Sequence, residues 1–362
     1  GDGVPVEIHK DHDIYVPELI FGNLLTSSNY HEEGKIVGGK NGYGAKLANI
    51  YSTDFWVETV CSKNKKFYKQ HFHQNMYQVD KAEIKPVKGN VSSYTKITFR
   101  PDLSRFSCDS LSDDMVALMK KRAYDLAACT GSRIKVFLND NLIEIKNFEE
   151  YIKMFYDDEN DNGNNSDDDD IINKNDGDGD EDDNEEHSSE ATYSKPIYET
   201  VNSRWKVAVV YDPAVSYQQI SYVNGICTFQ GGTHVTHVTT QIVNALSKHI
   251  KDKHKDVKVR DSQIRDNMTV FIECTIEDPA FNSQTKECLT NKVIKFGSRC
   301  DVSEEFIKKL IKDTDIVKTV VSFAKLKELS EMKKSDGKKR GNLRGIAKLD
   351  EADWCGSHRR SS

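Results

Sequence analysis

The residues best suited to chemistry form a glycine-rich run at positions 38–46, with the sequence GGKNGYGAK. Glycine adopts positive φ at no steric cost and lets a ligand approach the main chain closely. The run leads into an apolar-patterned segment at 45–51, and a helix N-terminus there would offer free N–H groups to an anion. Lys40 and Lys46 add positive charge. These features predict a phosphate-binding loop, with an ordinary glycine-rich loop as the alternative.

The run differs from two common phosphate-binding patterns. It does not match G-x-x-x-x-G-K-[ST], and it does not follow a strand as a dinucleotide-binding fingerprint does. A second glycine turn lies at 1–5, and a cluster of small polar side chains lies at 26–30. Either alone is typical of turns and helix caps. Their order along the chain resembles that of the gyrase, chaperone, histidine-kinase and mismatch-repair ATPases, in which the polar loop forms a lid over the nucleotide.

Hydrophobic periodicity indicates two successive units of helices and strands around these residues. In the first unit, helices are expected at 16–25, 45–51 and 113–129, and strands at 54–61, 66–72, 93–99 and 134–138. In the second, strands are expected at 204–211, 218–227 and 268–276, and helices at 235–250 and 303–325. Helices on one face of a largely antiparallel sheet form an α+β sandwich. The predicted fold class is therefore α+β.

Charge is distributed unevenly along the chain. The formal net charge is -7, but residues 157–190 hold 17 Asp or Glu and a single basic residue, Lys174. The remainder has 50 Lys or Arg and 41 Asp or Glu, a net charge of +9, which favours polyanions as its ligands. We expect the acidic insert to be disordered, because it cannot bury enough apolar surface to offset the entropy of ordering it.

Cysteines, histidines and apolar runs argue against several other classes. The eight cysteines stand singly, with no C-x-x-C pair, so we expect reduced thiols. His234 and His237 lack a third ligand nearby, and the acidic insert lacks the EF-hand pattern, so no protein metal site is predicted. No apolar run approaches the ~20 residues that span a bilayer, and the chain opens on no signal sequence. We therefore expect an intracellular protein with no membrane partner.

Two segments make the resemblance specific. YVPELIFGNLLTSSNY at 15–30 and GGKNGYGAKL at 38–47 are similar, almost word for word, to the ATPase domain of eukaryotic type IIA DNA topoisomerases. Further segments are similar to that family in the same order: PDLSRF at 101–106, QISYVN at 219–224, GGTHV at 231–235, PAFNSQTKE at 279–287 and KLDEAD at 348–353. The resemblance covers the chain except for the acidic insert.

The resemblance implies a fold and a function. The fold is a partial gyrase/chaperone/histidine-kinase-type ATP-binding sandwich at 1–148, a ribosomal-protein-S5-like transducer domain at 191–330, and a linker at 331–362 towards a DNA-cleavage core. The parent enzyme would use ATP and Mg²⁺ to pass one DNA duplex through a break in another, as a homodimer in the nucleus. This region would be its ATP-operated dimer gate. The alternatives are a vestigial, non-hydrolysing interaction module and a chaperone- or mismatch-repair-type ATPase.

The resemblance also assigns roles to individual residues. The ATP-binding residues that it implies are Ser27, Ser28, Asn29, Lys40, Asn41, Gly42, Tyr43, Gly44, Ala45, Lys46, Gln284 and Lys286. Lys286 is the implied catalytic residue, since a mobile cation can stabilise the γ-phosphate during transfer and lose that partner after hydrolysis. Lys251, Lys253 and Lys255 are the implied contacts to double-stranded DNA.

The sequence departs from the family pattern at both ends. The helix that carries the general-base Glu and the Mg²⁺-binding Asn would lie upstream of the first glycine turn, and the cleavage tyrosine would lie beyond the last residue. We therefore expect a fragment with weak nucleotide binding and little hydrolysis. Lys40 stands where many relatives have Arg, which keeps the charge but loses the bidentate fork.

Overall fold

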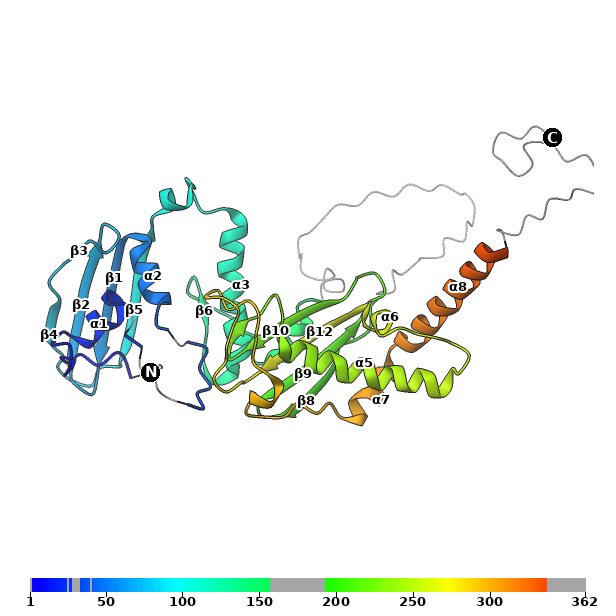
Figure 1. The fold of residues 1–362 in the computed structure, drawn as a ribbon. Coiled ribbons are helices and arrows are strands. Elements are labelled where there is room, and N and C mark those ends of the chain that lie inside the picture. The colour runs from blue at the N-terminus through cyan, green and yellow to red at the C-terminus, as the bar shows by residue number, and fades with distance from the viewer. Residues whose placement is uncertain (1, 25, 28–32, 40, 157–192, 337–362) are drawn as a thin grey trace, which may run out of the picture.

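The computed structural model describes residues 2–24, 26–27, 33–39, 41–156 and 193–336, with side chains described up to residue 330. Two separate β-sheets each carry their own helices, and the long helix α3 (Asp113–Thr130) stands between them in Figure 1. The α+β fold class predicted from the sequence is confirmed.

The first sheet is antiparallel throughout. Its strands are β1 (Ser52–Cys61), β2 (Lys66–His73), β3 (Gln78–Val79), β4 (Glu83–Pro86) and β5 (Tyr94–Pro101), in the order β3-β2-β1-β5 with β4 also on β2. Helices α1 (Val16–Gly22) and α2 (Gly44–Ile50) pack on one face, against the side chains of Phe55 and Phe72. Because side chains alternate along a strand, Trp56 and His71 belong to the opposite face.

The second sheet mixes parallel and antiparallel pairs. Its strands are β8 (Ile197–Asn202), β9 (Trp205–Tyr211), β10 (Gln218–Val223), β11 (Ile226–Cys227) and β12 (Met268–Cys274), in the order β11-β10-β12-β9-β8. Strands β10 and β12 are parallel, and the crossover between them holds α5 (Thr233–Lys253) and α6 (Asp261–Arg265). The β10–β11 turn uses Asn224 and Gly225 at φ 50° and 74°, the conformation of a two-residue hairpin loop.

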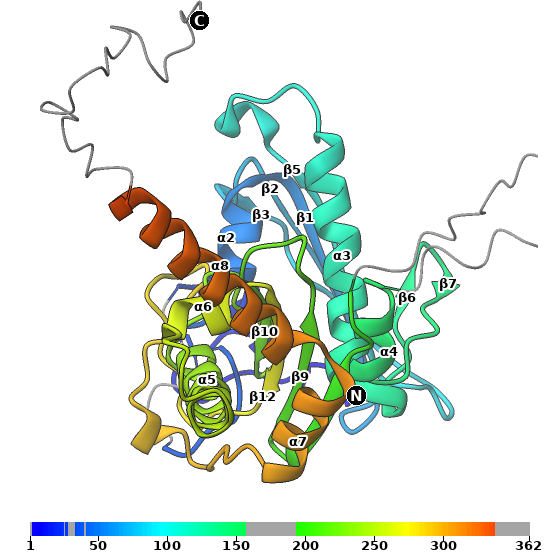
Figure 2. The same ribbon diagram turned by 90° about the vertical axis from the view of Figure 1, so that its right-hand side faces the viewer.

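Both faces of the second sheet are covered. On one face, α5, α7 (Glu304–Asp313) and α8 (Ile316–Asp336) pack on apolar strand residues such as Val209 and Ile272. On the other, the end of α3 and the short α4 (Phe148–Lys153) pack on Val210 and Phe271. Figure 2 shows the two groups of helices on opposite sides of the sheet. The remaining elements are β6 (Phe137–Leu138), β7 (Asn141–Leu142) and short 3-10 turns at Leu103–Phe106, Gly131–Arg133 and Val293–Lys295.

Several predicted elements have different ends in the structure. The helix expected at 303–325 is two helices, because the backbone of Thr314 is extended, at φ -131° and ψ 158°. The Thr314 hydroxyl donates to the carbonyl of Leu310 and ends α7 there. The strand expected at 134–138 is reduced to two residues of β6.

Two of the predicted divisions can be located on the fold. The boundary placed at residue 148 falls on the first residue of α4, whose Phe148, Tyr151 and Ile152 pack on the second sheet. Helix α8 continues to Asp336, beyond the residue at which the linker was expected to begin. The predicted acidic insert at 157–190 lies entirely outside the described residues.

Candidate nucleotide site

The glycine-rich loop meets the polar segment that precedes it in the sequence. Gly42 has φ +65°, and a Cβ placed on it would lie 3.2 Å from Ser27 Cβ and 3.3 Å from Lys46 Nζ. A side chain at position 42 would therefore strain the backbone and crowd both neighbours. The structure brings together three of the predicted ATP-binding residues, Ser27, Gly42 and Lys46.

Lys46 is a basic residue whose side chain is almost completely buried. The residue is 2% exposed, and among the described residues its Nζ makes no hydrogen bond or ion pair. Burial lowers the pKa of its ammonium group, because removal from water disfavours the charged form. A buried cation without a counter-charge is costly unless an anion joins it. The loop therefore presents a cationic site that an anionic ligand would complete.

Two polar contacts fix the loop relative to α1. Asn49, buried in α2, donates from Nδ2 to the carbonyl of Phe21 at 3.0 Å. Thr26 donates from Oγ1 to the carbonyl oxygens of Leu19 and Asn23, both at 3.0 Å. The polar segment is thus tied to the end of α1, and α1 is tied to the helix that follows the glycine-rich loop.

The first glycine turn has a structural explanation. Gly3 has φ +71°, and a Cβ there would lie 2.2 Å from the carbonyl oxygen of Val60 in β1. The next residue, Val4, donates its N–H to Thr59 Oγ1 at 3.1 Å. This turn packs closely against the main chain near the end of β1, which accounts for its glycine.

The segment between the polar cluster and the glycine-rich loop reaches the second unit. The backbone N–H groups of Gly34 and Lys35 donate to the carboxylate of Asp278 at 2.7 and 3.1 Å, and Asp278 N–H donates to the Lys35 carbonyl at 2.7 Å. A Cβ on Gly38 would lie 2.1 Å from the side chain of Ile226. This segment therefore links the polar loop, which the resemblance predicts to be the lid, to the second unit.

We predict that Asp278→Ala loosens this contact. Two charge-assisted hydrogen bonds are lost, at about 1.5 kcal/mol for a partly exposed pair, so amide hydrogen exchange in residues 33–39 should become roughly tenfold faster. Asp278→Asn, which keeps an acceptor oxygen, should show a smaller change, and Asp301→Ala, at an exposed carboxylate outside the contact, should show none. Unchanged exchange in the Asp278→Ala variant would contradict the account.

Asp278 also begins the loop that holds the predicted catalytic lysine. Lys286 is half-buried, has φ +61°, and donates its N–H to the Ser283 carbonyl at 3.2 Å. Burial lowers the pKa of the Lys286 ammonium group. Gln284 is exposed. In the part of the chain that the structure describes, no hydrogen bond or ion pair joins either side chain to the glycine-rich loop.

The other predicted ATP-binding residues divide into two groups. Gly44 begins α2, Ala45 packs against the first core, and Asn41 and Tyr43 are partly exposed. Ser28, Asn29 and Lys40 lie outside the described residues.

The predicted DNA-binding lysines lie at the far end of α5. Helix α5 ends at Lys253, three residues later than the sequence predicted. Lys251 and Lys253 occupy its last turn, and Lys255 follows the helix. All three are exposed. The helix thus carries a cluster of cationic side chains at its C-terminal end, where they complement the helix dipole.

His234 and His237, the pair considered above as a metal site, lie in different environments. His234 is fully buried, lies 3.2 Å from Thr228 Oγ1, and has a pKa lowered by burial to about 3, so its imidazole is neutral. His237 donates from Nε2 to the Cys300 carbonyl at 3.1 Å. Both histidines thus lie within the second unit and point to different partners, although His234 Nδ1 is buried with no hydrogen-bond partner among the described residues.

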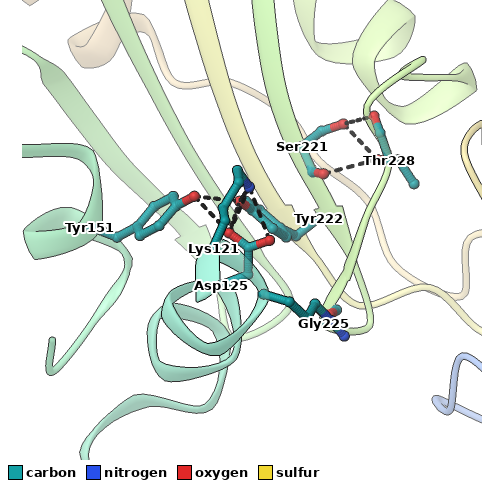
Figure 3. A network of polar contacts seen from close by, with 8 residues as sticks. Lys121, Asp125, Tyr151, Ser221, Tyr222, Gly225 and Thr228 are labelled. Atoms are coloured by element: carbon teal, nitrogen blue, oxygen red, sulfur yellow. Dashed lines mark hydrogen bonds and ion pairs between the residues drawn. The ribbon is translucent and has the colours of Figure 1, made fainter. Parts of the chain in front are cut away.

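A buried polar network that was not foreseen joins α3 to the second sheet (Figure 3). Asp125 Oδ1 accepts from the hydroxyl of Tyr151 at 2.7 Å, from Tyr222 at 2.8 Å and from Lys121 Nζ at 2.8 Å. Arg122 donates to the Gly225 carbonyl at 2.7 Å. Burial raises the pKa of both tyrosines, so they remain neutral donors. In the sequence Asp125 follows Lys121 by four positions, the spacing of an ordinary surface ion pair on a helix, so no local signal marks this cluster.

The two α+β units, with a buried lysine beside the glycine-rich loop of the first, have the fold of an ATPase region of the topoisomerase II type. The family model described as DNA gyrase B matches residues 148–340, and the chain belongs to this family of gyrases and type II topoisomerases. In the described part of the chain, no helix has the length and apolar character needed to cross a membrane.

Individual relatives agree with this family. The probable DNA topoisomerase 2 of Dictyostelium discoideum is 42% identical over 361 residues, which are 98% of this chain and 22% of that protein. The ATPase region of Saccharomyces cerevisiae topoisomerase II is 40% identical with a TM-score of 0.75, covering 90% of this chain and 75% of that one. The ATPase and transducer domains of Balamuthia mandrillaris topoisomerase II are 37% identical, with a TM-score of 0.77, covering 91% and 75%. The chain spans about a fifth of the length of the curated relatives it matches.

Proposed function

We propose that this chain is the ATP-binding dimer gate and transducer of an enzyme that passes one DNA duplex through a break in another. The observation that carries the proposal is the buried Lys46 beside Gly42 and Ser27, which has no counter-charge in the described part of the chain and which an anionic ligand would complete. We propose ATP as this anionic ligand, with Mg²⁺ as its counter-ion. The family and the named relatives support the same conclusion.

The route from nucleotide to movement runs through the lid. Ser27, Ser28, Asn29 and the loop at 40–46 would hold the ribose and phosphates. Lys286, carried on the loop that begins beside Asp278, would approach the γ-phosphate and lose that partner on hydrolysis. Because Asp278 also binds Gly34 and Lys35, a change at the nucleotide would move the lid and the second unit together. Closure of two such protomers would trap a DNA duplex, and such an enzyme would work in the nucleus.

Sedimentation tests the gate. We expect a non-hydrolysable ATP analogue with Mg²⁺ to convert an upstream-extended form of this chain from monomer to dimer, and Lys286→Ala to abolish its hydrolysis while binding is retained. Lys292→Ala, at an exposed lysine six residues away, is the matched control. If the extended form neither binds the analogue nor dimerises, the ATP gate is vestigial and the chain is an interaction module, the alternative from another functional class.

DNA contact by the end of α5 has its own signature. Each lysine–phosphate contact contributes about 0.9 to the slope of log affinity against log salt, so replacing Lys251, Lys253 and Lys255 by Ala should lower that slope by up to roughly 3. Replacing Lys308, Lys309 and Lys312 of α7, which are equally exposed, changes the net charge by the same amount. Equal loss of affinity in both triple variants would show a general effect of charge and would contradict DNA contact by the end of α5.

A further inference from the structure

A cluster of histidine and aspartate side chains lies on the face of the first sheet opposite to α1 and α2. His71 and His73 are two residues apart on β2 and therefore share a face, and Asp80 follows β3 directly. Their candidate ligand atoms all lie within 4.8 Å of one another. The ring of Trp56, on the neighbouring strand, stacks on His71 with centroids 4.6 Å apart.

The spacing within the cluster suits a metal ion. His71 Nδ1 lies 3.3 Å from Asp80 Oδ2, and His73 Nε2 lies 3.2 Å from Asp80 Oδ1. Two ligand atoms that are each about 2.0–2.1 Å from a tetrahedral zinc ion lie about 3.3 Å apart. The two imidazole rings stack at an interplanar angle of 17°, so the His73 ring must turn for both nitrogens to converge. A side chain that is 26% exposed has room for that rotation.

A further carboxylate orients the first histidine. His71 Nε2 lies 3.1 Å from Asp54 Oδ1, and Asp54 Oδ2 accepts from the hydroxyl of Thr53 at 3.1 Å. A carboxylate on one imidazole nitrogen places the proton there and leaves a lone pair on the other, as in carboxylate–histidine–zinc sites. The Nδ1 lone pair then faces an oxygen of Asp80. Two such electron pairs repel each other unless a proton or a metal cation lies between them.

The backbone of Asp80 is already held in place. Its N–H donates to the His71 carbonyl at 2.9 Å, and its carbonyl accepts from Gln70 Nε2 at 3.1 Å. Gln70 is itself buried and accepts from the Tyr68 hydroxyl. The third ligand is thus fixed to the strand that carries the two histidines, which reduces the ordering cost of binding an ion.

We infer that His71, His73 and Asp80 bind a divalent transition-metal ion such as Zn²⁺, with Asp54 as a positioning residue and water completing the coordination. Two imidazoles and one carboxylate suit Zn²⁺ and its neighbours, whereas Mg²⁺ and Ca²⁺ prefer oxygen ligands. No protein metal site was predicted from the sequence, and the inferred site departs from that prediction. The ion would tie β2 to the segment that follows β3, on the side of the sheet away from the nucleotide loop.

Zinc binding to the chelator-treated, reduced 362-residue chain tests the inference. We expect one Zn²⁺ per chain by competition with a chromophoric chelator, at least about 100-fold weaker binding in His73→Ala and Asp80→Ala, and roughly 10- to 100-fold weaker binding in Asp54→Asn. Co²⁺ should give d–d absorption bands in the wild type that His73→Ala lacks. Zinc should raise the melting temperature of the wild type and not of the His73→Ala variant.

Two control variants separate this site from other zinc ligands. His9→Ala/His12→Ala removes another pair of adjacent histidine rings, and Cys108→Ser removes an exposed thiol. Both should bind zinc as the wild type does. The inference is overturned if the wild type binds no zinc, if His73→Ala and Asp80→Ala bind it equally well, or if either control variant abolishes binding.

Discussion

Lys46→Met should weaken binding of a non-hydrolysable ATP analogue by about 10- to 100-fold, because a charge-assisted contact to phosphate is worth about 1.5–3 kcal/mol. The same substitution should leave the melting temperature unchanged or raise it. The Lys46 side chain is buried with no counter-charge among the described residues, and an apolar side chain of similar length removes that penalty. Loss of binding together with undiminished stability distinguishes a ligand-binding lysine from a structural one.

The pKa of Lys46 adds a pH dependence to this prediction. Burial lowers the pKa, whereas bound phosphate would raise it, so affinity should fall as pH rises through the lowered pKa of the free site. Stability of the free protein should change in the opposite sense, rising over the interval up to the ordinary lysine pKa, since the unfolded chain there binds more protons. Lys88→Met, at an exposed lysine, is the control for both measurements. Full affinity in Lys46→Met would refute the assignment.

Asp125→Ala should lower the free energy of unfolding by about 3 kcal/mol. The buried hydroxyls of Tyr151 and Tyr222 lose their common acceptor, and each such loss costs about 1–3 kcal/mol. Their mutual contact of 2.7 Å offsets only part of this cost. Urea unfolding followed by circular dichroism measures the change.

Variants with matched chemistry show whether the network is the cause. Asp125→Asn keeps an acceptor oxygen and should cost less than Asp125→Ala. Asp109→Ala removes an exposed carboxylate and should change stability by less than about 0.5 kcal/mol. Because the network fastens α3 to β10, Asp125→Ala should also speed amide exchange in both elements. Equal losses of unfolding free energy in the two alanine variants would show that the network does not stabilise the fold.

The elements that could be predicted from the sequence are those with local causes. The glycine-rich run predicted a loop before a helix, and α2 begins at Gly44 within it. The alternation at 66–72 predicted β2 almost to the residue. In each case the pattern and the structure involve the same few neighbouring residues.

The features that could not be predicted depend on distant partners. In the sequence Asp278 resembles an ordinary loop residue. Its contacts with Gly34 and Lys35 form only when the two units fold. In the sequence Asp125 resembles a carboxylate on a helix surface. Its partner Tyr222 lies on a strand 97 positions later, and only the fold brings the two together. The His-x-His spacing at 71 and 73 is visible in the sequence, but Asp80 joins it only through the pairing of β2 with β3.

The most direct test of the nucleotide site is equilibrium binding of a labelled, non-hydrolysable ATP analogue with Mg²⁺ to this chain, with tripolyphosphate and adenosine as competitors. We predict saturable binding that tripolyphosphate displaces and adenosine does not, because the buried cation beside Gly42 recognises phosphate. Absence of saturable binding, or displacement by adenosine alone, would contradict the proposal that Lys46 and the glycine-rich loop hold the triphosphate.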